Sequence, residues 1–413
     1  MTKVITFGCR LNFYESDLIK DFLSSNNGEE IIVINTCAVT NEAERQVKQR
    51  IRRCHREDPN KKIIVVGCGV QLDPEGYLAI PGVFKVLGNI EKLQLENYKS
   101  EKRILVGDIS AVDKDISRRK AVSPILSGRT RSFLEIQNGC DHDCTFCAIT
   151  LARGKNRSVP VEVLIAEVRE MAEAGVLEVV LTGVDITDYG KDLFGKPSLS
   201  YLIRAILDNV PELPRLRLSS VDVAELDDEF IGLFVSEPRL MPHIHLSLQS
   251  GDEMILKRMK RRHNLKQIRD FYSRVSSLRS VTAFGADIIA GFPTETEEMF
   301  LNTYRLIEEL AIPYLHVFPF SPKKGTKAAL MPQVDESIRK RRAKQLIELG
   351  KKKLREFYEA QIGQVHNVVL ERDNIGRSEN FSVVKLDHAV EGPSTLKVRI
   401  NSCNSDMLIG QII

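Results

Sequence analysis

The chain has 413 residues, with 59 Lys and Arg against 56 Asp and Glu, and its formal charge of +3 excludes a polycation. Hydrophobic residues make up 43% and charged residues 28%, which is typical of a globular protein and, at this length, of about three domains. No run approaches the roughly 18 consecutive apolar residues that span a membrane. We therefore expect a cytoplasmic protein without a membrane partner, whose nucleic-acid contacts would come from local clusters of Lys and Arg.

Residues 1–110 predict a small open α/β domain. Three short apolar runs are typical of buried parallel strands, and two amphipathic stretches between them predict helices. The runs are 4–7, 31–34 and 63–66, and the stretches are 11–23 and 41–57. Residues 111–131 mix charges, Ser, Gly and Pro without a clear period, so we interpret them as a linker.

Residues 132–360 repeat the alternation on a larger scale. The strand-like runs are 133–136, 178–181, 216–219, 244–248, 284–289 and 315–318, and helical patterns lie at 161–173, 225–234, 265–278 and 295–310. This order predicts a curved parallel sheet, a partial (β/α)6 barrel, with its sites at the carboxyl ends of the strands. A long helix, 336–360, closes the region.

Residues 361–413 change to short strand-like runs separated by Asn, Asp, Gly and Pro. The runs are 367–370, 381–386, 396–400 and 408–413. We predict a small β-barrel here. The predicted fold class is therefore α/β, with an N-terminal open α/β domain, a central partial barrel and a small C-terminal barrel.

Three of the eight cysteines form a C-x3-C-x2-C loop just beyond the first central strand. They are Cys140, Cys144 and Cys147. In a reducing compartment, grouped thiols are more often metal ligands than disulfides. Three thiolates are one short of the four ligands of a structural zinc or a fully ligated [4Fe–4S] cluster, so a cluster held here keeps one open iron. A zinc site that borrows a distant fourth ligand is the alternative.

Three further cysteines, Cys9, Cys37 and Cys68, each follow one of the predicted N-terminal strands. The carboxyl ends of parallel strands meet at one edge of a sheet, so we expect these thiols to converge and to offer a second three-thiolate site. The alternative is that they only fill a core, as free cysteines often do. Cys54 lies on the apolar face of the second predicted helix, which favours core packing, and Cys403 has no assigned role.

The sequences around these cysteines form ordered motifs. They are Gly8-Cys-Arg-Leu-Asn12, Ile34-Asn-Thr-Cys-Ala-Val-Thr40, Val66-Gly-Cys68 and Gln137-Asn-Gly-Cys-Asp-His-Asp-Cys-Thr-Phe-Cys147. Further motifs include His243-Ile-His-Leu-Ser-Leu-Gln-Ser-Gly251 and Gly285-Ala-Asp-Ile-Ile-Ala-Gly-Phe-Pro-Thr-Glu295. Together they resemble the methylthiotransferase family of radical S-adenosylmethionine (SAM) enzymes, over nearly the whole chain.

The resemblance implies an enzyme that uses SAM and two [4Fe–4S] clusters, each held by one of the two groups of three cysteines. It implies no classical acid or base, because cofactors rather than side chains must activate an aromatic C–H bond. The candidates for binding SAM lie at strand ends and beside the cysteine loop. They are Phe146, Thr182, Gly183, Arg217, Ser219, Ser220, Gln249 and Phe318.

Within the family, the chain resembles the subgroup that converts N6-threonylcarbamoyladenosine, next to the tRNA anticodon, to its 2-methylthio derivative. This implies a tRNA substrate, an electron donor, an RNA-binding C-terminal barrel of the TRAM type and no DNA partner. Three clusters of Lys and Arg, at 45–56, 257–262 and 339–355, are candidates for phosphate contacts.

Alternatives remain open at this point. Within the family, the substrate could be isopentenyladenosine in tRNA or an aspartate of a ribosomal protein. Outside it, the chain could be a non-catalytic RNA-binding protein that contains zinc.

Overall fold

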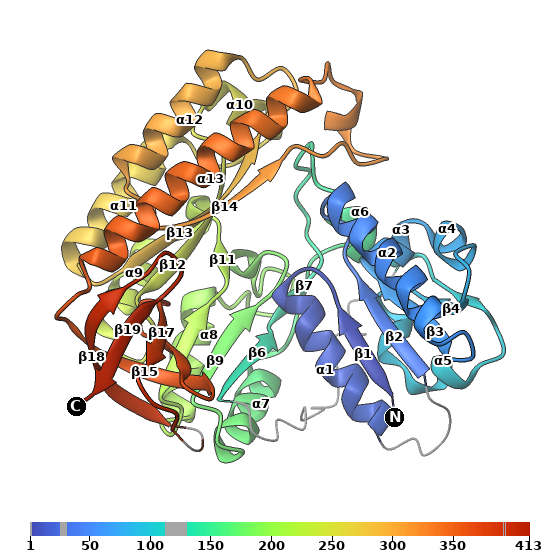
Figure 1. Ribbon diagram of the computed structural model, residues 1–413, viewed down its shortest axis with the longest axis horizontal. Helices are drawn as coiled ribbons and strands as arrows, with labels where there is room; N and C mark the ends of the chain where they lie inside the picture. Colours follow the sequence, from blue (N-terminus) through green and yellow to red (C-terminus); the bar gives the residue numbers. More distant parts are fainter. Residues whose placement is uncertain (1, 25–30, 112–129, 391, 393) are drawn as a thin grey trace.

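The computed structural model describes residues 2–24, 31–111, 130–390, 392 and 394–413. An N-terminal α/β region lies beside a larger curved sheet, and a small barrel lies against one end of that sheet (Figure 1). Most of the predicted linker, 112–129, lies outside the described residues. None of the helices in the described part of the chain is long and apolar enough to cross a membrane.

The N-terminal sheet is parallel, in the order β1-β2-β3-β4-β5. Its strands are β1 (Lys3–Thr6), β2 (Ile31–Thr36), β3 (Lys62–Gly67), β4 (Val83–Leu87) and β5 (Ile104–Leu105). Its helices are α1 (Arg10–Ser24), α2 (Asn41–Glu57), α3 (Cys68–Leu72), α4 (Pro74–Leu78) and α5 (Leu95–Lys99). Every residue of β2 is buried, which explains its apolar run. The predicted strands and helices are confirmed, whereas β4, β5 and the three short helices were not predicted.

The central sheet is also parallel, in the orders β6-β9-β10 and β11-β12-β13-β14. The strands are β6 (Arg131–Glu135), β9 (Glu178–Thr182), β10 (Arg215–Leu218), β11 (Ser220–Val221), β12 (His243–Gln249), β13 (Ala283–Ala290) and β14 (Tyr314–Pro319). Because β10 and β11 follow one another through Ser219, the two sections form one curved sheet. This confirms the predicted partial barrel. A short pair, β7 (Gln137–Asn138) with β8 (Arg157–Ser158), lies beside the cysteine loop.

Helices cover the outer face of the central sheet (Figure 1). They are α7 (Val161–Glu173), α8 (Leu199–Asn209), α9 (Asp228–Ser236), α10 (Glu253–Met259), α11 (Leu265–Leu278), α12 (Glu297–Glu309) and α13 (Glu336–Glu359), whereas α6 (Ile149–Arg153) follows the cysteine loop. The helix predicted at 225–234 begins later, at Asp228, because Asp227 accepts a hydrogen bond from the N–H of Phe230 and caps it. The helix predicted at 295–310 likewise begins after its cap, Thr296.

Five strands close the C-terminal barrel, in the order β15-β16-β17-β19-β18. They are β15 (Val365–Arg372), β16 (Ile375–Ser378), β17 (Val383–Leu386), β18 (Thr395–Cys403) and β19 (Leu408–Ile412). The predicted barrel is confirmed, although β16 was not predicted. The strand predicted from Phe381 begins at Val383, because Phe381 has a φ of 75° in the turn before it. Cys403 packs against the barrel core.

Candidate functional site

Three thiols meet at the carboxyl edge of the N-terminal sheet. Cys9 follows β1, Cys37 follows β2, and Cys68 begins α3 directly after β3. Cys37 and Cys68 are buried, and Cys9 is exposed. Burial, together with the neighbouring Cys68 and Cys9 thiols, raises the pKa of Cys37 to about 12. The structure therefore brings together the three cysteines that the strand ends predicted, in surroundings where a bound metal would favour the thiolate.

Gly8 lets the backbone pass close to Cys37. It has a φ of 98°, and a Cβ built on it would lie 2.8 Å from Cys37 Sγ. Gly8→Ala is therefore expected to displace this thiol and to lower the iron content after anaerobic reconstitution. Gly175→Ala is the matched control, because Gly175 has a φ of 87° but no atom within 4 Å of an added Cβ. Equal iron content in the two variants would mean that the added Cβ does not displace the Cys37 thiol. Gly8→Ala would then add only backbone strain, about 1–2 kcal/mol, as Gly175→Ala also does.

The C-x3-C-x2-C loop lies between β7 and α6. The N–H of His142 lies 3.5 Å from Cys140 Sγ, and Cys147 Sγ accepts a backbone hydrogen bond at 3.4 Å. Arg261 Nη1 donates to Cys144 Sγ at 3.7 Å. Burial raises the pKa of Cys140 to about 12 and that of Cys147 to about 11. Partly buried thiols near hydrogen-bond donors fit the ligands of an iron–sulfur cluster, whose sulfurs are tuned by such donors.

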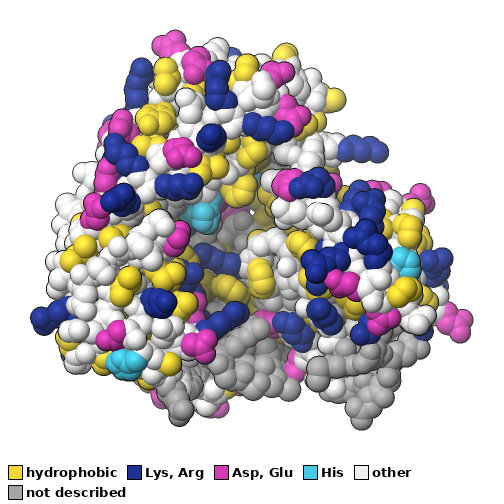
Figure 2. Space-filling view, in the orientation of Figure 1, with side chains coloured by type: hydrophobic (Ala, Val, Ile, Leu, Met, Phe, Trp, Pro, Cys, Tyr) yellow, Lys and Arg dark blue, Asp and Glu magenta, His cyan; other side chains and the backbone are white. Residues whose placement is uncertain are grey.

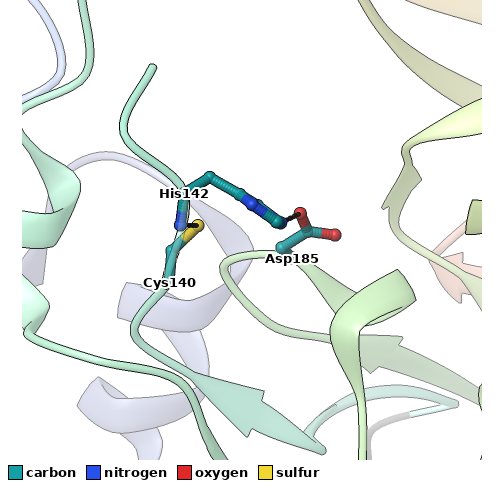
Figure 3. Close-up of side chains that lie close together, drawn as sticks. All are labelled: Cys140, His142 and Asp185. Carbon is teal, nitrogen blue, oxygen red and sulfur yellow. Dashed lines mark hydrogen bonds and ion pairs between the residues drawn. The ribbon is translucent and has the colours of Figure 1, made fainter. Parts of the chain in front are cut away.

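His142 does not complete this site as a fourth ligand. Its Nε2 lies 3.4 Å from a carboxylate oxygen of Asp185 and 2.5 Å from one of Asp188, and Figure 3 shows the ring turned toward Asp185 and away from the Cys140 thiol. Asp185 and Asp188 raise the pKa of His142 to about 9. The proximity of Cys140, His142 and Asp185 is therefore accounted for by the pairing of the ring with Asp185 and Asp188.

The two cysteine groups belong to elements that pack together. Ala38, Cys68 and Ala152 form one small core, which places α3 of the N-terminal region against α6 of the cysteine loop. Asn89 spans the same contact, because its Nδ2 donates to the Ala152 carbonyl at 2.7 Å and lies 3.6 Å from Cys68 Sγ. The N-terminal thiol group therefore lies against the helix that directly follows the cysteine loop.

A buried ion cluster lies in the same interface. Glu15 of α1 accepts hydrogen bonds from Arg153 Nη1 at 2.9 Å and from Lys92 Nζ at 2.5 Å, and the exposed fraction of each side chain is 2% or less. Burial alone would raise the pKa of Glu15, but Arg153 and Lys92 lower it to about 2. Arg153 is also close enough to Cys68 and Cys9 to interact with their charges. The cluster was not predicted from the sequence, although a Glu at helical spacing among the apolar residues of α1 signals it.

Most candidates for binding SAM lie at the carboxyl ends of central strands. Thr182 ends β9 and Gly183 follows it, Ser219 and Ser220 stand where β10 passes into β11, and Gln249 ends β12. Gln249 has a φ of 68°, a left-handed conformation that residues other than glycine adopt rarely. Backbone strain of this kind is concentrated at ligand sites.

The other three candidates have different surroundings. Phe146 packs edge-on against Phe292, with ring centroids 6.5 Å apart, and Phe318 on β14 is 37% exposed. Arg217 is fully buried and donates to the Glu178 carboxylate at 2.8 and 2.9 Å and to a carbonyl of the C-terminal barrel. The guanidinium of Arg217 therefore already has protein partners.

Family models match both cysteine-bearing regions. One described as "Radical SAM superfamily" matches residues 134–307, and one described as "Uncharacterized protein family UPF0004" matches residues 2–89. A protein of Rickettsia prowazekii named threonylcarbamoyladenosine tRNA methylthiotransferase MtaB is 49% identical over 386 residues, which are 93% of this chain and 91% of the relative. The chain belongs to the methylthiotransferase family of radical SAM enzymes.

More distant relatives carry related names. A Bacillus subtilis protein with the same name as the Rickettsia protein is 33% identical over 99% of this methylthiotransferase and 91% of its own length. A Bartonella tribocorum protein named tRNA-2-methylthio-N(6)-dimethylallyladenosine synthase is 30% identical, over 98% of this chain and 95% of its own.

Solved structures share the fold at low identity. The radical SAM methyltransferase TsrM from Kitasatospora setae has a TM-score of 0.54 and 12% identity, and the match covers 78% of the methylthiotransferase and 73% of TsrM. The radical SAM enzyme OxsB has a TM-score of 0.54 and 12% identity, over 85% of this chain and 56% of its own. They confirm the fold, and the family implies SAM and [4Fe–4S] clusters as cofactors.

The three basic clusters of the methylthiotransferase differ in their partners. In 257–262, Lys260 pairs with Asp143 of the cysteine loop, Arg261 with Asp222 and Arg262 with Glu225, so these cations already have protein partners. In 339–355, most cations pair with glutamates of α12 or α13. Figure 2 shows Lys and Arg gathered over the N-terminal region. Among the described residues, the cations of α2 without an ion pair are Lys48, Arg50, Arg52 and Arg56.

Proposed function

We propose that this methylthiotransferase acts on N6-threonylcarbamoyladenosine in tRNA and replaces the C–H bond at carbon C2 of the base by C–S–CH3. The observation that carries the proposal is the packing of the two cysteine-bearing regions against each other, where Cys68 contacts Ala152 of the helix that follows the cysteine loop, because the product needs both C–H activation and a sulfur donor at one carbon. The substrate is inferred from the names of the Rickettsia and Bacillus relatives.

We assign the six cysteines as ligands in two groups. Cys140, Cys144 and Cys147 would hold one [4Fe–4S] cluster, and Cys9, Cys37 and Cys68 the other. Bound SAM and clusters supply the electron, radical, sulfur and methyl chemistry that side chains lack. The protein's own residues orient these groups and exclude water, and Arg261 adds positive charge beside Cys144.

The remaining assignments follow from the positions of the residues. Thr182, Gly183, Ser219, Ser220 and Gln249 surround the carboxyl ends of β9 to β12 and would contact SAM, with Phe146 and Phe318 beside them. Arg217 is left out, because its donors already contact Glu178 and the C-terminal barrel. We place the domain limits at 1–110, 132–360 and 361–413, and we infer a cytoplasmic enzyme that takes its electrons from a separate donor.

Two competing functions have weaker support. A dimethylallyladenosine substrate is named for a relative of 30% identity, against 49% for the threonylcarbamoyladenosine enzyme. A zinc-containing RNA-binding protein would need a fourth ligand beside the three loop cysteines, and the histidine of the loop, His142, is paired with Asp185 and Asp188.

Deleting this gene is expected to leave N6-threonylcarbamoyladenosine in tRNA without its 2-methylthio form. The wild-type gene on a plasmid restores the modified nucleoside, and a plasmid carrying Cys144→Ala does not. Mass spectrometry of nucleosides from digested tRNA measures both. If the methylthio form of dimethylallyladenosine disappears instead, the substrate assignment is wrong and the reaction class stands.

A further inference from the structure

Arg10 is a cation without a protein partner at the edge of the candidate site. It follows Cys9 directly and begins α1. Its guanidinium lies 5.7 Å from the centroid of the Phe381 ring, and no hydrogen bond or ion pair joins it to any of the described residues. A guanidinium has five N–H donors, and a largely covered one without an acceptor is costly. Such a side chain is suited to an acceptor that arrives with a ligand.

Three side chains from adjacent strands lie in the same region. They are His245 of β12, Asp287 of β13 and His316 of β14. Asp287 Oδ1 lies 3.1 Å from His245 Nε2 and 3.3 Å from His316 Nδ1, so both rings contact one carboxylate oxygen. The His316 side chain is 57% exposed and can turn a ring nitrogen toward a ligand. Figure 2 shows a hollow between the two larger regions, with a histidine and Lys or Arg side chains on its walls.

The charge of this region favours an anion over a metal ion. The charged groups close enough to act on Arg10 are Arg131, Arg217, Arg377 and Asp287. Arg131 and Arg217 pair with Glu178, and Arg377 pairs with Glu371, so these arginines have their own partners. Asp287 is shared by two histidines and forms no ion pair with Arg10. A divalent cation would enter a region that already holds an excess of positive charge.

We propose that Arg10, together with the His316 that contacts the neighbouring Asp287, binds the carboxylate of the threonyl group of the substrate nucleoside. The proposal rests on the proposed function, because it concerns the N6 substituent of that base. A threonylcarbamoyl group ends in a carboxylate, which a guanidinium can bind through two parallel hydrogen bonds, whereas a dimethylallyl group is apolar. Arg10 follows Cys9 directly, and its guanidinium lies against Phe381 of the C-terminal region, so this contact would hold the N6 substituent between the N-terminal thiols and that region. Arg10 would thus select the substrate.

The test compares charged and neutral forms of one substrate. Anticodon stem-loops carrying N6-threonylcarbamoyladenosine or its methyl ester are given to the reconstituted enzyme, and kcat/KM and equilibrium binding are measured. The wild type is expected to prefer the free carboxylate by about 10- to 100-fold, the range of a buried charged hydrogen bond. Arg10→Gln is expected to remove most of this preference, and Arg10→Lys to restore part of it.

Matched measurements separate the possible failures. Arg204→Gln, an exposed arginine of α8, is expected to keep the full preference, and the iron content of each variant is determined. Equal use of acid and ester by the wild type, or an unchanged preference in Arg10→Gln, overturns the inference and leaves the proposed function intact. A wild type that converts neither stem-loop overturns both. A divalent metal lost in His316→Gln but retained in the cysteine variants would make this region a metal site and overturn the inference.

Discussion

Replacing Cys37 by Ala is expected to lower the bound iron from about eight to about four atoms per chain, whereas Cys54→Ala keeps about eight, as two [4Fe–4S] clusters require. Both cysteines are buried thiols of the N-terminal region, which makes them a matched pair. Cys37 lies at the end of β2 beside Cys9 and Cys68, but Cys54 packs with Val47 and Ile51 in a hydrophobic core. Only the first therefore has other thiols with which to share a cluster.

Iron and sulfide analysis after anaerobic reconstitution measures this difference, and the product nucleoside is measured alongside. Cys37→Ala is expected to abolish methylthiolation, and Cys54→Ala to leave it near the wild-type rate. Cys144→Ala provides the complementary case, with the other half of the iron lost. Equal iron in the Cys37 and Cys54 variants would show that the N-terminal thiols are core filler. Stoichiometric zinc in place of iron would contradict the cluster assignment for both groups.

The elements best predicted from the sequence include helices whose first turn carries a local capping signal. The helices at 41–57, 161–173 and 265–278 have the limits that were predicted. Thr40 caps the first through the N–H of Ala43, and Asn264 forms a capping box with Gln267 at the third. Such contacts span three residues, so the sequence contains the whole interaction.

The elements that were missed depend on distant partners. Strand β4 contains the buried Lys85, whose charge interrupts the apolar pattern. In the folded chain, Lys85 Nζ donates to the carbonyls of Asn97 and Tyr98, more than ten residues away. No periodicity of the strand itself reveals those acceptors, so tertiary contacts decided the structure here.

The candidate site was predictable from the sequence only in part, as the fold was. The convergence of Cys9, Cys37 and Cys68 follows from the rule that parallel strands end at one edge, and the structure bears this out. The surroundings of Arg217 did not follow, because its partner Glu178 and the C-terminal barrel come from other parts of the chain. A position near a strand end predicts a neighbourhood, but it does not predict which side chains are already paired.

Glu15→Gln is expected to lower the free energy of unfolding of the N-terminal region by about 3–5 kcal/mol, the usual effect of breaking a buried ion pair. The variant leaves Arg153 and Lys92 as buried cations with no carboxylate between them. Because both regions contribute to the cluster, we also expect faster proteolysis at their interface. Glu57→Gln is the control, since Glu57 forms an exposed pair with Arg53 at 2.6 Å, and we expect little change from it.

The pH dependence gives a second measurement of the same ion cluster. Arg153 and Lys92 lower the pKa of Glu15 from 4.5 to about 2 against the effect of burial, so the folded state binds its proton less readily than the unfolded chain does. The stability from Glu15 is therefore complete above about pH 4.5 and is lost as the pH falls toward about 2. The free energy of unfolding, measured in urea at several pH values in this window, should decrease more steeply with falling pH for the wild type than for Glu15→Gln. Parallel curves would mean that Glu15 is not ionised in the folded protein, and that Arg153 and Lys92 do not stabilise the folded state through its charge.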